Sequence, residues 1–299
     1  LEDPTFRLSI DAPALDIGDF YAKAKGILSI NGHLEGRRSA PVAELQVQGR
    51  DISVAGQPVA ELDLDLDLTG KRLNVASLVL ALTEDARIEG GGWLETAPDG
   101  AYALSLRSAA FPLSSIAALN AQEAVTGLVS FDINGSGRLD DPGLSGDIRF
   151  TEMRLNQAPI DDGRFDLSVA GGRVQVAGGL NFDLDASYRW ASQEFEAILG
   201  FDDTQLGPYL AAAGQSDLAG RLNGRIRASG DLSQPKQLEA HVDLTEVALT
   251  YKGLPLLATE ALKADLANET LQLAPTRVRL LEDGMLEAVG EMNFTEVRE

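Results

Sequence analysis

The sequence has no cysteine, only two histidines (His33 and His241), and 25 Lys and Arg against 46 Asp and Glu. Without cysteine there is no disulfide framework, thiolate nucleophile, or Cys-based zinc or iron–sulfur site. Two isolated imidazoles are too few for a His-rich metal site or an ordinary set of catalytic bases. The net charge of −21 excludes a general nucleic-acid binder, because phosphate contacts need clustered Lys and Arg. It also argues against adsorption to an anionic membrane.

Long apolar runs are missing as well. No stretch approaches the roughly 18 uninterrupted apolar residues of a transmembrane helix, and the opening LEDPTFRLSIDAP lacks the apolar core of a signal peptide. The first residue is Leu1 rather than Met, so we expect a soluble segment of a longer protein whose anchor lies elsewhere. Hydrophobic residues still make up 44%, which is enough for a sizeable apolar face and argues against disorder.

The motifs that resemble catalytic or metal sites are incomplete. Asp63, Asp65 and Asp67 resemble a calcium-binding DxDxD, but Leu68 and Asn74 stand where an EF-hand needs Gly and Glu. The alternation favours a solvated strand face instead.

The acidic pairs and two of the serines are no better candidates for catalytic residues. Asp140–Asp141, Asp161–Asp162 and Asp202–Asp203 lie in segments that we predict to be turns, where Asp bonds the local backbone. Ser136 and Ser145 do not match G-x-S-x-G, and we predict tight turns there too. We therefore predict a protein that is not an enzyme, with no catalytic residue, metal or cofactor.

What the sequence does have is alternation of apolar and polar residues. In ELDLDLDL (61–68) the leucines fall on one face and the acids on the other, which is typical of a half-buried antiparallel strand. Similar runs include SFDI (130–133), RFDLSV (164–169), LNFDLDASYRW (180–190) and LEAHVDL (238–244).

Turn signals separate these runs. Examples are NG at 31–32, PDG at 98–100, NGSG at 134–137 and AGG at 170–172, whereas GGG at 90–92 favours a bulge or a close backbone approach. We predict an almost all-β fold with short Ala/Leu-rich helices near 14–24, 112–124 and 204–213.

An internal repeat follows from this order of elements. Each predicted helix precedes an alternating strand, a first proline (Pro41, Pro142, Pro235), two more strands and a second proline (Pro58, Pro159, Pro255). Repeats stack into extended arrays. We predict one continuous elongated β-array over 1–299, with approximate units 14–120, 121–212 and 213–299.

The apolar face of such an array must be covered by a second layer, by its own curvature, or by a ligand. A sheet curled along its length makes an aliphatic trough, for which a lipid acyl chain is the natural occupant. We predict that the trough is lined by Leu62, Leu64, Leu66, Leu68, Phe131, Ile133, Ile148, Phe150, Phe165, Leu167, Val169, Phe182, Leu184, Val242, Leu244, Leu262 and Leu266.

Three segments carry a family resemblance. GRLDDPGLSGDIRF (137–150), SGDLSQPKQLEAHVDL (229–244) and GLPLLATEALKADLANETLQL (253–273) resemble the TamB family, the inner-membrane subunit of the translocation and assembly module, within the AsmA-like superfamily. The Gly-rich strands IEGGGWLE (88–95) and MLEAVGEMNF (285–294) extend the likeness. RRSAPVAEL (37–45), at the corresponding place in the first repeat, departs most from the segments that carry the resemblance.

The resemblance implies a β-taco, an antiparallel sheet curled into a U-shaped apolar trough. It implies a periplasmic location with attachment to the inner membrane through a segment outside this chain. It further implies phospholipid transport between the inner and outer membranes, support of outer-membrane protein assembly, and an outer-membrane barrel partner of the TamA type. The family has no catalytic residues to carry over.

Two other classes stay open. A secreted adhesin or autotransporter passenger would also be acidic, cysteine-free and repetitive, but its β-helix rungs would repeat at a much shorter period. A polysaccharide-active β-helix enzyme is disfavoured by the missing catalytic constellation. Detection of co-purifying phospholipid would separate these classes.

Overall fold

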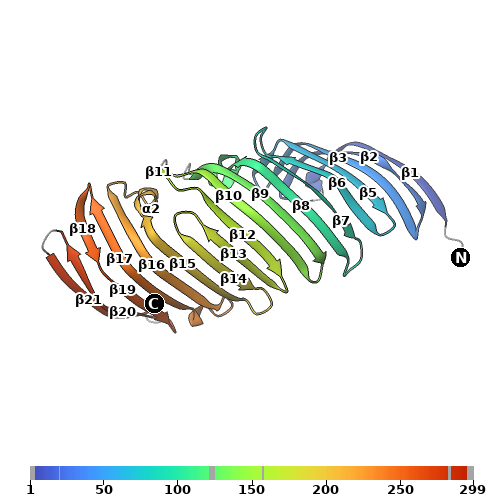
Figure 1. Ribbon diagram of the computed structural model, residues 1–299. Coiled ribbons are helices and arrows are strands. Elements are labelled where there is room, and N and C mark those ends of the chain that lie inside the picture. Colours follow the sequence, from blue (N-terminus) through green and yellow to red (C-terminus); the bar gives the residue numbers. More distant parts are fainter. Residues whose placement is uncertain (1–3, 20, 121–124, 157, 282–283, 295–299) are drawn as a thin grey trace. The chain divides into compact units, whose positions relative to one another are not determined.

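The computed structural model describes residues 4–19, 21–120, 125–156, 158–281 and 284–294 (Figure 1). The fold is all-β: strands make up 74% of the chain and helices 6%, and the 21 strands of the described part pair antiparallel. The predicted fold class is therefore confirmed, and the U-shaped curl implied by the resemblance stays a prediction.

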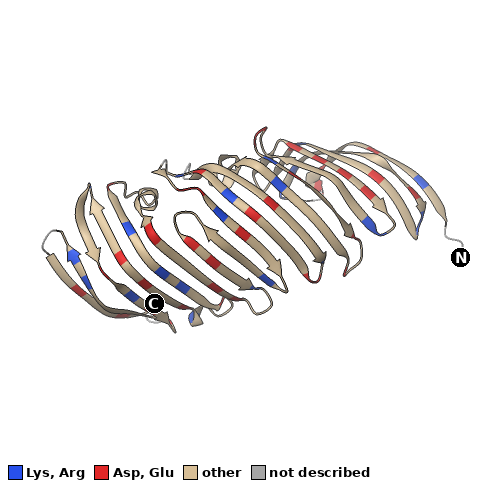
Figure 2. Ribbon diagram, viewed as in Figure 1, with Lys and Arg blue, Asp and Glu red and all other residues tan. Residues whose placement is uncertain are grey.

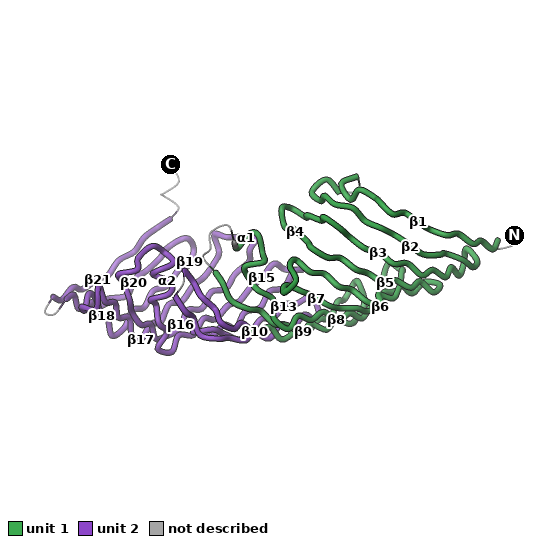
Figure 3. The backbone as a smooth tube through the Cα atoms, turned by 90° about the horizontal axis from the view of Figure 1, so that it is seen from above, with its two compact units in different colours: residues 1–149 green, residues 150–299 purple. Residues whose placement is uncertain are grey.

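The chain divides into two compact units, Leu1–Arg149 and Phe150–Glu299 (Figure 3). The first unit contains β1 Thr5–Asp16, η1 Ile17–Asp19, β2 Ala24–Arg37, β3 Ala40–Val54, β4 Gln57–Val59, β5 Glu61–Thr69, β6 Arg72–Ala81, β7 Arg87–Glu95, β8 Ala101–Pro112, η2 Leu113–Ser115, α1 Ala117–Asn120 and β9 Val125–Arg138.

The unit boundary falls inside β10, Pro142–Leu155. The second unit continues with β11 Ala158–Pro159, β12 Gly163–Ala170, β13 Arg173–Gly179, β14 Asp183–Arg189, β15 Glu194–Gln205, α2 Gly207–Ala212, β16 Leu218–Asp231, η3 Pro235–Gln237, β17 Glu239–Tyr251, β18 Leu254–Thr259, β19 Leu262–Ala267, β20 Thr270–Leu280 and β21 Gly284–Asn293.

The same order of elements occurs three times along the chain. A helical segment (η1, η2–α1 or α2) is followed by two long strands, a short strand (β4, β11 or β18) and a series of further strands. The second proline of each repeat lies in the short strand, at Pro58, Pro159 and Pro255. Each short strand pairs with the end of the long strand before it. The division into three units at 14–120, 121–212 and 213–299 stays a prediction.

The buried core is small and lies near the helical segments. In the first unit it includes Ile52 of β3, Val59 of β4, Phe111 of β8 and Leu113 of η2, each under 9% exposed. Several other core side chains are alanines. Since few large apolar side chains are fully buried, most of the apolar sheet face keeps intermediate exposure.

The helix predicted at 14–24 is wrong. β1 runs to Asp16 and β2 begins at Ala24, with a single 3₁₀ turn at Ile17–Asp19 between them. The pairing of Leu15 with Leu28 continues the β1–β2 ladder into this segment, so tertiary pairing overrides the helical spacing. The helix predicted at 204–213 is confirmed as α2, whereas the prediction at 112–124 becomes η2 and α1, with 121–124 outside the described residues.

Several predicted turns are also wrong. NG at 31–32 lies within β2, Ser136 within β9 and Ser145 within β10. Gly32 serves a close backbone approach, because an added Cβ would lie 2.1 Å from the carbonyl oxygen of Glu44.

Asp202 and Asp203 lie in β15 at a shift of register, not in a turn between strands. The Asp203 backbone takes a φ of 48°, and its N–H donates to Asn223 Oδ1 at 2.6 Å. The pair therefore marks a β-bulge.

Candidate functional site

Register places the predicted apolar residues of β5 on one face of the first unit. Leu64 lies opposite Val47 and Leu78, and Leu66 lies opposite Leu45 and Val75. Residues opposite each other in antiparallel strands point to the same side. The acids alternate to the other side, where Asp65 lies opposite Gln46.

Two cross-strand rows on this face contain only apolar residues and glycine from β1 to β9. They are Ala12–Ile30–Val47–Leu64–Leu78–Gly90–Leu106–Ile133 and Ile10–Gly32–Leu45–Leu66–Val75–Gly92–Leu104–Gly135.

The second unit has an equivalent pair of rows from β12 to β21. They are Phe165–Gly178–Leu184–Leu199–Ile226–Val242–Ala264–Leu273–Gly290 and Leu167–Val176–Ala186–Ala197–Ala228–Ala240–Leu266–Leu271–Met292. We call the sides that carry these rows the apolar faces of the two units.

The remaining predicted lining residues are placed as follows. Leu62, Leu68, Val169, Leu244 and Leu262 share a face with the rows by pairing. Phe131 precedes Ile133 by two residues in β9, and Ile148 follows Gly146 by two residues in β10, where Gly146 lies against Ile133. Phe150 packs edge to face on Phe165 at 5.8 Å, while Phe182 lies just before β14. Leu244 is buried, and the other predicted residues are half-buried.

The opposite faces carry the charges. Arg107 contacts Glu89 at 2.9 Å, Lys263 contacts Asp243 at 3.6 Å, and His241 pairs with Asp265. Figure 2 shows such charged positions on the strands of both units. Ion pairs of this exposed kind contribute little stability. The two-residue alternation of the strands keeps these charges off the apolar faces.

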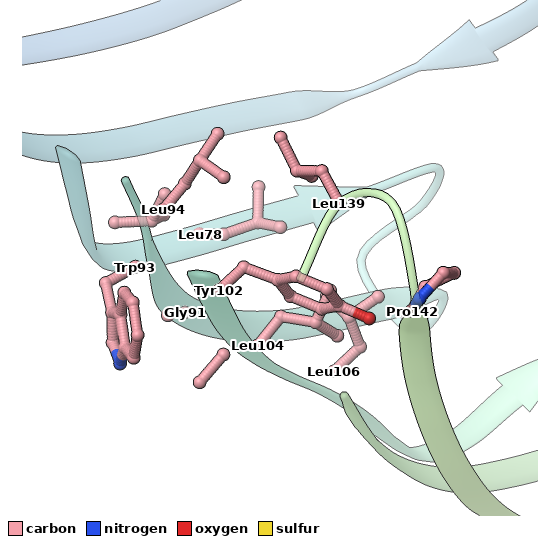
Figure 4. Close-up of a pocket in the computed structure, with 12 residues that line it drawn as sticks. Leu78, Gly91, Trp93, Leu94, Tyr102, Leu104, Leu106, Leu139 and Pro142 are labelled. Atoms are coloured by element: carbon pink, nitrogen blue, oxygen red, sulfur yellow. The ribbon is translucent and has the colours of Figure 1, made fainter. Parts of the chain in front are cut away.

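An apolar hollow of about 490 Å³ lies in the first unit. We call it the β7–β8 hollow. It is lined by Val75, Leu78, Gly91, Gly92, Trp93, Leu94, Tyr102, Ala103, Leu104, Leu106, Leu139 and Pro142. Figure 4 shows Leu139 and Pro142 on one side of it and Leu94 on the other, with the Tyr102 ring between them. The Trp93 ring lies away from the other lining side chains, and the Arg72 guanidinium lies 4.0 Å from its centroid.

The glycines of β7 shape this hollow. A Cβ on Gly90 would lie 2.5 Å from the Ser105 carbonyl oxygen, and one on Gly92 would lie 2.2 Å from that of Ala103. Gly92 also takes a φ of 154°. Ala76 and Ser77 bulge opposite Gly91, where the β6–β7 register shifts. Of the two alternatives predicted for GGG, the close backbone approach is therefore confirmed, whereas the bulge lies in β6 opposite it; the lack of side chains on these glycines leaves space beside Leu104 and Leu106.

The turn between β9 and β10 forms one wall of the hollow. Leu139 N–H donates to the Gly100 carbonyl oxygen at 3.1 Å, and the Tyr102 hydroxyl donates to that of Gly143 at 2.9 Å. Both bonds tie the turn to β8 and its preceding turn, which positions Leu139 over the apolar face.

Arg138 reinforces this wall. It donates to Asp99 Oδ2 at 2.6 Å and to Asp140 Oδ1 at 3.0 Å. These hydrogen bonds lower the pKa of both carboxyl groups and raise the pKa of the Arg138 guanidinium. All three groups are fully exposed, so solvent screens the interaction.

Sequence reasoning missed the residues of the β7–β8 hollow, although part of the signal was present. Tyr102, Leu104 and Leu106 alternate clearly within YALSLR. The bulge in β6 obscures the alternation of Val75 and Leu78, and no sequence pattern marks Leu139 as a wall residue.

Metal ligation has no support in the described part of the chain, which holds no group of three His, Cys, Asp or Glu side chains arranged around a common point. Within the same residues, no helix combines the length and apolar character needed to cross a membrane. No family model matches the sequence, and neither a curated protein nor a solved structure matches it.

Proposed function

We propose that this chain is a non-enzymatic lipid-binding and lipid-conducting segment whose apolar faces hold phospholipid acyl chains. In keeping with the resemblance to TamB, it would belong to a periplasm-spanning protein attached to the inner membrane. That protein would move phospholipid between the two membranes and support outer-membrane protein assembly with a barrel partner of the TamA type.

The β7–β8 hollow is the observation that carries this proposal. Its volume of about 490 Å³ lies within the range of roughly 300–1,000 Å³ found for small-molecule sites. Its walls are leucine, valine, glycine and aromatic carbon, with the Tyr102 hydroxyl already bonded to Gly143. A saturated hydrocarbon therefore fits this lining better than a polar ligand does.

The energetic scale supports an acyl chain. Burial of each methylene contributes about 0.8 kcal/mol, so a long chain gains on the order of 10 kcal/mol as an upper bound. A chain lying on a half-open sheet face keeps part of its surface in water and gains less. Weaker binding of the acyl chain suits a lipid conduit, from which lipid must leave as well as enter.

The apolar rows support movement along each unit. A sliding chain meets a barrier wherever it must pass a polar, solvated step. The two rows in each unit contain only apolar residues and glycine, and their charged neighbours alternate to the opposite face. Each unit thus offers hydrocarbon contact along all the strands that its rows cross.

Site-specific photo-crosslinking tests the proposal. We would place p-benzoylphenylalanine at Leu139, over the hollow, and at Ser105, which points to the opposite face of β8. In cells, we expect phospholipid adducts by mass spectrometry at position 139 and none at position 105. Equal adducts at both positions, or none at 139 in a folded protein, would contradict lipid binding at this face.

A pair of neighbouring variants separates binding from folding. Leu104→Asp places a charge in the hollow and should abolish the adduct at 139, whereas Ser105→Asp adds the same charge to the polar face and should leave it unchanged. Circular dichroism and thermal unfolding of both variants would show that each still folds. An adduct that persists in folded Leu104→Asp protein would count against the hollow as the site.

A further inference from the structure

Two arginines stand side by side on the polar face of the second unit. Arg225 and Arg227 are two residues apart on β16, so both side chains point to the same side, with their Cα atoms about 6.6 Å apart. They lie opposite Asp243 and His241 of β17, respectively. Two like charges this close repel each other and weaken the strand pairing unless a counter-charge is present.

Asp243 and Asp265, the carboxylates that line the same surface on β17 and β19, are already engaged, whereas Glu196 and Glu239 line a neighbouring hollow with Arg227. Asp243 Oδ1 contacts Lys263 Nζ at 3.6 Å, and Asp265 pairs with His241. Neither Arg225 nor Arg227 forms a hydrogen bond or an ion pair with any residue of the described part of the chain. In a chain with a formal charge of −21, these two guanidinium groups retain free donors.

The same residues surround a hollow of about 550 Å³, which we call the β16 hollow. Arg225, Arg227 and Lys263 line it, together with Asp243, Asp265 and His241. Three permanent cations thus face two carboxylates. The β16 hollow differs in this from the hollow around Arg173 and Arg189 in the same unit, where four carboxylates outnumber two arginines.

We propose that Arg225 and Arg227 form a binding site for a phosphate group. Guanidinium groups donate two parallel hydrogen bonds to phosphate oxygens, and a dianion neutralises both arginines at once. Lys263 adds a point charge from β19, two strands away. The site lies on the face opposite the apolar rows, so it is independent of acyl-chain binding.

Phosphate could come from a free phosphate or a phosphomonoester, or from a lipid headgroup on a membrane. The net charge of −21 opposes approach to an anionic membrane, because repulsion by the whole chain acts before the local contacts form. We therefore expect a small free phosphate as the ligand.

Calorimetric titration with inorganic phosphate tests the site. We expect one saturable site in the wild type and a loss of about tenfold or more in affinity for Arg225→Gln/Arg227→Gln, since charge-assisted hydrogen bonds are removed. The control is Arg50→Gln/Arg277→Gln, which changes the charge equally at exposed strand positions outside the β16 hollow and should bind phosphate like the wild type.

Thermal unfolding gives a second readout. At constant ionic strength, phosphate should raise the Tm of the wild type and of the control, and leave that of Arg225→Gln/Arg227→Gln unchanged, because only the folded site binds it. Equal phosphate binding by all three proteins, or no saturable binding by the wild type at millimolar phosphate, would overturn the proposal.

Vesicles distinguish the source of the phosphate group. We expect no co-sedimentation with vesicles of phosphatidylcholine and phosphatidylglycerol. Co-sedimentation that is lost in Arg225→Gln/Arg227→Gln would assign the site to headgroup phosphate instead of a free phosphate. Co-sedimentation that is equal in all three proteins, without a response to inorganic phosphate, would exclude a phosphate site at these arginines.

Discussion

Individual side chains at the β9–β10 turn show how polar contacts position an apolar residue. Leu139 is 50% exposed, so burial alone does not hold it over the β7–β8 hollow. Its place depends on backbone bonding to Gly100 and on the ties that Arg138 makes to Asp99 and Asp140. Because two of these hydrogen bonds are accepted by carboxylates, the stability of the β9–β10 turn should depend on pH.

We predict that Arg138→Gln lowers the Tm at neutral pH and that the difference from the wild type shrinks in acid. The pKa values of Asp99 and Asp140 are lowered in the folded state from an ordinary value of 3.8. Their contribution is therefore present above that value and is lost as the pH falls through the lower folded values. Thermal unfolding of both proteins from pH 7 to pH values of about 3 measures this.

Arg50→Gln is the matched control, because Arg50 is exposed on β3 and forms no hydrogen bond or ion pair with the described residues. Its difference from the wild type should not depend on pH in the acid range. If the Arg138→Gln difference persisted undiminished in acid, the turn would be held by something other than these carboxylates.

At the scale of the elements, the helical segments are attached to the sheet by specific polar contacts. Gln57 of β4 bridges to the segment η2–α1: its Nε2 donates to the Ser115 carbonyl oxygen at 3.0 Å, and its Oε1 accepts from Ala117 N–H at 2.7 Å. In the second unit, Asn156 Nδ2 donates to the Ala211 carbonyl oxygen of α2 at 3.4 Å. Short helices need such contacts, because four to six residues are too few to be stable alone.

We predict that Gln57→Ala destabilises the first unit by about 1–2 kcal/mol and increases hydrogen exchange at Leu113–Ser115 and Ala117–Asn120. The substitution removes the Nε2 donor and the Oε1 acceptor of Gln57 together, so the Ala117 N–H loses the acceptor of its hydrogen bond. Urea unfolding and exchange measured by mass spectrometry would show the effect.

Gln48→Ala serves as the control, since Gln48 is exposed and makes one long contact of 3.4 Å to Asp63. It should change neither measurement. Unaltered exchange over η2 and α1 in Gln57→Ala would mean that apolar packing of Leu113 suffices to hold the segment.

At the scale of the whole molecule, the main electrostatic feature is the large negative net charge. A formal charge of −21 produces self-repulsion in the folded state, while the ion pairs on the polar faces are mostly single, exposed contacts. Salt screens both effects, and the repulsion involves many more charges than any one pair.

We predict that the Tm rises when NaCl is increased from about 20 to 200 mM, because screening relieves more repulsion than attraction. Differential scanning calorimetry at pH 7 measures this. A Tm that falls with salt would show that the exposed ion pairs outweigh the net charge. Comparison with KCl at the same concentrations would separate screening from binding of a specific cation.

The sequence by itself determined the class of fold and the chemical character of its two faces. Alternation in ELDLDLDL and RFDLSV depends only on the two-residue period of a strand, so it predicts which residues share a side without knowledge of their partners. Leu64, Leu66 and Leu167 lie on the apolar rows for this reason. The GGG segment likewise predicted a close backbone approach, because only glycine lacks the Cβ that would clash there.

Pairing between strands that are distant in the sequence decided which turn signals lie inside strands and which residues form the two hollows. Asn31–Gly32 and Ser136 carry turn signals but lie inside β2 and β9, since their cross-strand partners extend the ladders through them. The β7–β8 hollow needs Leu139 from another part of the chain, and the β16 hollow needs Lys263 of β19 together with Arg225 of β16. Register, bulges and close approach are set by contacts between strands. A local period cannot encode those contacts, so only the tertiary structure assembles these sites.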